Sequence, residues 1–189
     1  MAFLYNKLSR IILLSLIIIW GAASFFFVSN DIAIQITVLV LAVISLGFTF
    51  FEIMPIFLLI FLSFTTAYSL YGFYFLFNFP LWLVMLAILC IFGYIFVYNE
   101  QKIGILGNRR LIYLVLFSLI VLEVFLTLNF YLVSPISKSL IISIVSYVFV
   151  GFCYTILAKH EDNKFSTYLI IASIAIAAIL ASSVWGSYV

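Results

Sequence analysis

Apolar residues fill this chain in long blocks, and only short polar segments separate one block from the next. Each block holds about 20 residues, the length that an α-helix needs to cross the hydrocarbon core of a bilayer. The blocks are continuously apolar, whereas the strands of a membrane barrel alternate over about 10 residues. The pattern therefore predicts an all-α fold, a polytopic transmembrane helix bundle with seven spans. These spans cover residues 11–28, 32–51, 55–75, 81–98, 111–133, 140–157 and 168–185.

Composition strengthens this interpretation, because 68% of the 189 residues are hydrophobic and only 7% are charged. In soluble domains about a quarter of the residues are charged. The spans leave too few residues for an extramembrane domain, so residues 1–189 are predicted to form a single integral membrane domain. A water-soluble enzyme and a nucleic-acid-binding protein are thereby excluded. The lipid bilayer is the predicted environment, and other membrane protein subunits are the candidate partners.

Lysine and arginine residues gather in alternate connections between the spans. A cytoplasmic N-terminus places all of them inside except Lys138. Because short loops rich in Lys and Arg stay in the cytoplasm, we expect the N-terminus inside and the C-terminus outside, in a multi-pass protein of the plasma membrane. The predicted cytoplasmic cations are Lys7, Arg10, Lys102, Arg109, Arg110, Lys159 and Lys164.

The first span has a second interpretation. Lys7 and Arg10, an apolar run and the small residues of Gly21–Ser24 also fit a cleaved signal peptide. The apolar run continues to Val28, however, which is long enough to cross a bilayer, so we expect a retained span. Cleavage would leave six spans in the same orientation.

Glu123 is the charged residue that the prediction places deepest in a span, close to the middle of residues 111–133. A carboxylate at that depth costs on the order of 3 kcal/mol on insertion, which the surrounding Leu, Ile, Val and Phe outweigh. Such a group must face protein or water, and Thr127 lies one turn away on the same helix face. Two interpretations stay open: a proton, cation or ligand site, or a packing contact with a neighbouring helix.

Gln35 and Asn129 are the amides that complete this candidate ligand or proton site. Both are predicted towards the outer leaflet, which makes a polar pocket that opens outward a hypothesis. Nothing in the sequence itself brings their helices together.

Glu52 lies three residues before Pro55, so this segment predicts a tight hairpin at the cytoplasmic interface. We interpret Glu52 as a structural residue that favours the dipole of the following helix. A gating or proton-entry role is the alternative, because Glu52 is the only charged residue between Asp31 and Glu100. Asp31 is interpreted as a helix cap.

Small residues recur every four positions in the last span, where they form faces on which helix backbones approach closely. They are Ser173, Ala177 and Ala181 on one face and Ala178 and Ser182 on another. We expect this helix to be central in the bundle or to dock a partner. The fourth span, apolar almost all round, is expected to be peripheral and to face lipid.

Two segments read alike at an offset of 105 residues, Phe26–Ser29 and Tyr131–Ser134. A true repeat would relate the first three spans to the last three, as in transporters built from repeated units. Coincidence is the preferred explanation in a chain so rich in Phe, Leu, Val and Ser.

Little else in the sequence points to chemistry. Cys90 and Cys153 lie inside spans, and the motif from His160 to Asp162 lacks the spacing of a zinc site. No catalytic residue, metal site or cofactor is predicted, and an enzyme is not expected. The favoured function is a structural or accessory subunit that packs with other membrane proteins. The alternative is a small transporter or substrate-binding membrane component that uses Glu123.

Overall fold

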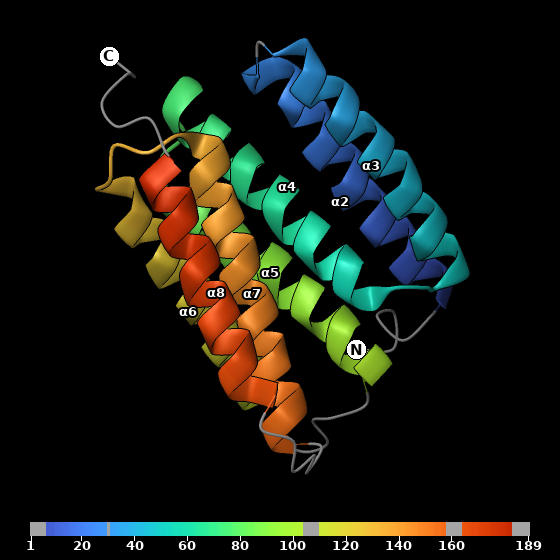
Figure 1. Ribbon diagram of the computed structural model, residues 1–189. Coiled ribbons are helices and arrows are strands. Elements are labelled where there is room, and N and C mark those ends of the chain that lie inside the picture. Colours follow the sequence, from blue (N-terminus) through green and yellow to red (C-terminus); the bar gives the residue numbers. More distant parts are fainter. Residues whose placement is uncertain (1–6, 30, 104–109, 158–163, 183–189) are drawn as a thin grey trace.

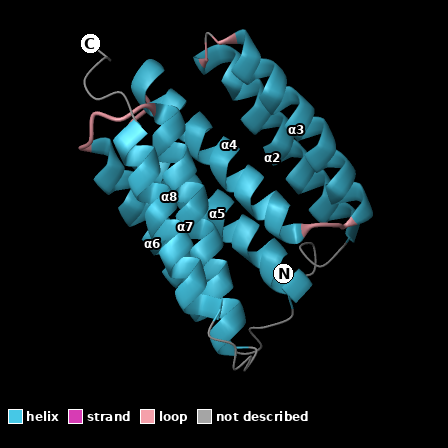
Figure 2. Cartoon of the chain, viewed as in Figure 1, coloured by secondary structure: helices cyan, strands magenta, loops and turns pink. Residues whose placement is uncertain are grey.

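The computed structural model describes residues 7–29, 31–103, 110–157 and 164–182, and every regular element within these ranges is an α-helix (Figures 1 and 2). The helices are α2 (Lys7–Val28), α3 (Ile32–Phe51), α4 (Pro55–Leu76), α5 (Leu81–Ile103), α6 (Arg110–Asn129), α7 (Pro135–Leu157) and α8 (Lys164–Ser182). Among the described residues, the six helices α2 to α7 are long and apolar enough to cross a membrane. The predicted helix bundle is thereby confirmed. In α8 the apolar stretch is shorter, Leu169–Ala181, and the seventh crossing stays a prediction.

Local chemistry sets the ends of several helices. The carboxylate of Asp31 accepts hydrogen bonds from the backbone N–H groups of Ala33 and Ile34, at 2.9 and 3.4 Å, which confirms the predicted cap of α3. Glu52 and Met54 both adopt left-handed backbone conformations, with φ of 56° and 51°, and Pro55 opens α4. A proline in the first turn of a helix loses no hydrogen bond, since the N–H there has no intrahelical acceptor.

The connection between α6 and α7 differs from the prediction. Helix α6 ends at Asn129, not Val133, and α7 begins at Pro135, not Leu140. The hydroxyl of Ser134 accepts a hydrogen bond from the backbone N–H of Ser137 at 3.2 Å, so Ser134 caps α7 and Pro135 is its first residue. This capping chemistry starts the helix earlier than the apolar run alone suggests.

Helix α4 is the centre of the bundle. It lies between the α2–α3 pair on one side and α7 on the other, and it also packs against α5 (Figure 1). Most of its residues are buried, including the hydroxyl residues Ser63, Thr65, Thr66 and Ser69.

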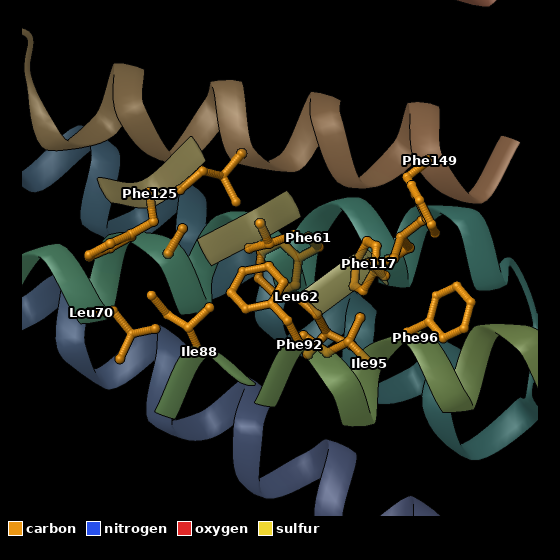
Figure 3. Close-up of a cluster of buried hydrophobic side chains, with 14 of the residues drawn as sticks. Phe61, Leu62, Leu70, Ile88, Phe92, Ile95, Phe96, Phe117, Phe125 and Phe149 are labelled. Atoms are coloured by element: carbon orange, nitrogen blue, oxygen red, sulfur yellow. The ribbon is translucent and has the colours of Figure 1, made fainter. Parts of the chain in front are cut away.

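Two expectations about helix position are met only in part. Helix α8 is not central: it packs mainly against α7, and Ala172 is the buried residue among its described side chains, while docking of a partner stays a prediction. Helix α5 exposes Leu81, Trp82, Leu86 and Leu89, as expected of a helix that faces lipid, but it also buries Ile88, Phe92 and Phe96 (Figure 3). Both helices are apolar almost all round, so their sequences do not mark the inward face.

Aromatic rings fill the core between α5, α6 and α7. The ring of Phe117 lies 5.1 Å from that of Phe96 and 5.3 Å from that of Phe149, measured between centroids (Figure 3). Leu62, Phe61 and neighbouring residues of α4 complete the cluster.

Helices α2 and α4 approach each other closely through small residues. A methyl group added at Gly21 would lie 2.8 Å from Cβ of Thr65, and one added at Gly72 would lie 2.5 Å from a methyl of Val28. The hydroxyls of Ser24 and Ser69 hydrogen-bond across this contact. The small residues that suggested a signal-peptide cleavage site therefore have a packing role in the folded chain.

The described cations are distributed unevenly between the two ends of the bundle. Lys7, Arg10, Arg110 and Lys164 lie at the starts of α2, α6 and α8, and Lys102 lies near the end of α5. Lys138 lies in the first turns of α7, at the opposite end. Arg109 and Lys159 are outside the described residues. We call the Lys138 end the outer end, following the predicted orientation.

Candidate functional site

A cavity of about 640 Å³ lies at the outer end of the bundle. Residues of the α2–α3 and α6–α7 connections line the cavity from two sides, and the end of α4 lies between these connections (Figure 1). We call this cavity the outer pocket. Its lining comprises Val28, Ser29, Asp31, Ile34, Tyr68, Tyr71, Gly72, Phe75, Leu76, Asn129, Tyr131, Leu132, Val133, Ser134, Pro135, Ile136 and Lys138.

Lys138 is the cation of this pocket. It follows the Ser134 cap by one turn, and its backbone N–H donates to the Ser134 carbonyl at 3.0 Å. The side chain is buried, with 4% of its surface exposed. Its ammonium nitrogen lies 5.5 Å from the ring centroid of Tyr71 and 4.9 Å from that of Phe75. Such cation–π contacts hold the ammonium group in place while leaving its hydrogen atoms available to an acceptor.

Tyr71 forms a rigid wall of the pocket. Its hydroxyl donates a hydrogen bond to the backbone carbonyl of Phe125 at 3.2 Å, and its ring stacks on the Phe125 ring with centroids 4.2 Å apart. Both contacts join α4 to α6. The ring on which Lys138 rests is therefore fixed by the core of the protein.

Asn129 and Asp31 line the pocket as well, together with serine and tyrosine hydroxyls. The side-chain oxygen of Asn129 is buried and has no hydrogen-bond partner among the described residues. A buried polar atom without a partner is costly, and a bound ligand is one way to satisfy it. Asp31 is exposed, and its carboxylate is engaged by the N-terminus of α3, so it marks the mouth of the pocket.

The charge of Lys138 is not balanced within the described part of the chain. Elsewhere in these residues, Lys7 pairs with Glu52 at 3.6 Å and Arg110 with Glu100 at 2.9 Å. No described carboxylate lies at ion-pair distance from the Lys138 ammonium. A buried cation of this kind favours an anion in the space it faces.

The residues of the predicted ligand site divide into two groups. Asn129 lines the outer pocket, and Gln35 lies beside it, donating a hydrogen bond from its side-chain nitrogen to the carbonyl of Ser29 at 2.6 Å. Glu123 and Thr127 do not join them: both are exposed on the side of α6 that faces away from the bundle. Helix α6 ends at Asn129, so its midpoint lies between Leu119 and Ile120. Glu123 lies one turn beyond that midpoint.

Glu52 lies at the opposite end of the bundle from the pocket. It forms the C-cap of α3, and its backbone N–H donates to the carbonyl of Phe48. Its carboxylate contacts Lys7 of α2, so it ties two helices together rather than preceding α4 directly. This structural role differs from the expected one, in which Glu52 favours the dipole of the following helix, and the gating alternative stays untested.

The small residues of α8 face away from the bundle. Ser173, Ala177, Ala178 and Ala181 are exposed, and the side chain of Ser182 lies outside the described residues. Within this chain they do not form the close helix contact that their spacing allows. Docking of a partner on this face stays a prediction.

The two segments that read alike meet at the outer pocket. Val28 and Ser29 line one side, and Val133 and Ser134 line the other. The three-helix units themselves pack differently, because α4 is central and the corresponding helix α8 is peripheral.

Lys138, Tyr71 and Phe75 are site residues that the sequence analysis missed. A signal for Lys138 was present: it was the single exception to the cation count, and it followed the Ser134–Pro135 helix start. Tyr71 and Phe75 carried no signal, since aromatic residues make up 20% of the chain.

The described residues contain no cluster of His, Cys, Asp and Glu side chains that suits a metal ion. The pocket thus combines one buried ammonium group, an amide, the carboxylate of Asp31, serine and tyrosine hydroxyls and an apolar remainder. Comparison with protein-family models, with curated proteins and with solved structures found no match to this chain.

Proposed function

We propose that this polytopic membrane protein is a substrate-binding membrane component that takes an anionic, partly apolar molecule into the outer pocket. The observation that carries the proposal is Lys138, buried against two aromatic rings with no described carboxylate at ion-pair distance. An anionic group placed on this ammonium would form the charge-assisted contact that the protein does not supply.

The walls of the pocket suit the rest of such a ligand. Val28, Ile34, Leu76, Val133 and Ile136 provide an apolar lining. The volume of about 640 Å³ falls within the range of small-molecule sites, which are mostly apolar with a few convergent polar groups. The Lys138 ammonium matches a single carboxylate or phosphate group attached to a hydrocarbon portion, whereas the free Asn129 oxygen would accept a hydrogen bond from a donor group elsewhere on the ligand.

A binding experiment tests this function. The protein is placed in nanodiscs of phosphatidylcholine and titrated with dansyl-undecanoate, whose emission rises on burial. We expect Lys138→Met to weaken binding at least about tenfold, or about 1.4 kcal/mol. Lys7→Met, at the opposite end of the bundle, is the matched control and should bind like the parent protein. The uncharged methyl ester of the probe should bind weakly to all three proteins.

Equal binding by the parent protein and Lys138→Met, or equal binding of the acid and its ester, would rule the proposal out. A second arm separates two sources of the same chemistry. Phosphatidic acid in the nanodisc competes with the probe if the pocket takes lipid headgroups, and leaves probe binding unchanged if the pocket takes soluble anions.

The second candidate function is an accessory subunit of a larger membrane complex. The exposure of Ser173, Ala177 and Ala181 on α8 favours it, because this face is open to a close helix contact. Purification in a mild detergent should then yield a stoichiometric partner, and Ala177→Leu should release it. Recovery of a monodisperse single chain would argue against this function.

A further inference from the structure

Glu123 presents a carboxyl group to the membrane side of α6. The side chain is exposed, and so is that of Thr127 one turn later. No hydrogen bond or ion pair joins the Glu123 carboxyl to another described residue. The midpoint of α6 lies between Leu119 and Ile120, so Glu123 is about 5 Å from it along the helix axis, and a bilayer centred on α6 places this carboxyl within the hydrocarbon layer.

A lipid-exposed carboxyl at this depth is costly, and ionisable residues in membrane helices almost always face other protein groups or water. The outer pocket does not meet this need, because Glu123 is not part of its lining. A second polypeptide packed against this face of α6 would supply the polar partner.

A second copy of this chain offers that partner at the right depth. All copies insert in the same orientation, so a two-fold axis along the membrane normal brings the two α6 helices together in parallel, with residues of equal number facing each other. A carboxyl group accepts hydrogen bonds in either protonation state, and the Thr127 hydroxyl of the other copy can donate one. The pair is therefore complementary to itself.

The apolar residues on the same face have a spacing suited to this contact. Ile112, Leu116, Leu119 and Glu123 follow each other at intervals of four, three and four residues, and all four are exposed. This is the spacing of the seam between two parallel helices that pack side chains into each other. We propose that two copies of the chain dimerise through this face of α6, with Glu123 of each copy accepting a hydrogen bond from Thr127 of the other.

Cysteine cross-linking in phosphatidylcholine vesicles tests the dimer. Cys90 and Cys153 are first replaced by alanine, and Leu119→Cys is introduced one turn before Glu123. Oxidation should yield a disulfide-linked dimer at least fivefold more than in Val43→Cys, the control in the exposed middle of α3. Adding Glu123→Leu should reduce the Leu119→Cys dimer at least fivefold, whereas Glu123→Gln should keep it within twofold, because glutamine still donates and accepts.

Three results would overturn the proposal. They are equal cross-linking at Leu119→Cys and Val43→Cys, an unchanged dimer in Glu123→Leu, and a purified chain that stays monomeric at every protein-to-lipid ratio. The last result would leave Glu123 to a different membrane protein. Monodispersity of the Glu123→Leu variant verifies its folding, and Lys138→Met should dimerise normally, which separates this inference from ligand binding.

Discussion

The contact between α2 and α4 and the surface of α8 carry the same sequence signal in opposite surroundings. Gly21 on α2 lies against Thr65 on α4, and Gly72 on α4 lies against Val28 on α2, so closely that a methyl group added at either glycine would clash. The hydroxyls of Ser24 and Ser69 hydrogen-bond at the same contact. Helix α8 has small residues at regular spacing too, yet it turns them outward. Spacing of small residues thus shows that a helix face permits close approach, but not that a neighbour in the same chain uses it.

The larger residues explain the difference. Ile176, Ile179 and Leu180 of α8 pack against the hydrophobic core, so the helix binds the bundle through its bulky side. At the α2–α4 contact both helices offer small or hydroxyl residues, and the two backbones come together. Close approach therefore requires small residues on both partners.

The largest expected effect is at Gly21. In Gly21→Leu the new side chain would overlap Thr65, since Cβ alone would lie 2.8 Å from two atoms of that residue. We expect the free energy of unfolding to fall by about 3 kcal/mol or more, because neither backbone can retreat without losing other contacts. Unfolding midpoints in a mild non-ionic detergent measure the change.

Gly47 on α3 provides the matched control for this substitution. An added Cβ there meets no atom within 4 Å, so Gly47→Leu should be neutral or stabilise by up to about 1 kcal/mol through helix propensity. Equal destabilisation by the two substitutions would mean that α2 and α4 are not in close contact.

A smaller effect is expected at Ser69. Its hydroxyl bonds with that of Ser24 and donates to the carbonyl of Thr65 at 2.8 Å. Ser69→Ala removes the link between α2 and α4 and should lower stability by about 1 kcal/mol. Ser173→Ala, on the exposed face of α8, should change it little. If both variants unfold at the same midpoint as the parent protein, the hydroxyl pair contributes nothing to the stability of the contact.

The sequence was informative about the helices and much less about their rotation. Continuous apolar runs predicted the spans, and local chemistry predicted the Asp31 cap and the hairpin before Pro55. Helices that are apolar all round, however, give no sign of their inward face. This is why Lys138 proved to be buried in the outer pocket and Glu123 to be exposed: packing between helices decides both, and it depends on residues far apart in the chain.

The smallest expected effect is at Ala177. In Ala177→Leu the added side chain would extend away from the bundle, since Ala177 is exposed. The free energy of unfolding of the isolated chain should therefore change by no more than about 0.5 kcal/mol. Ala172 lies on the same helix but is buried, and Ala172→Leu should cost about 1 to 3 kcal/mol through overpacking. A large loss of stability in Ala177→Leu for the isolated chain would show that α8 uses its small face within this bundle. Stability that stays unchanged leaves that face to contacts with another molecule, in contrast to the face that α2 turns to α4.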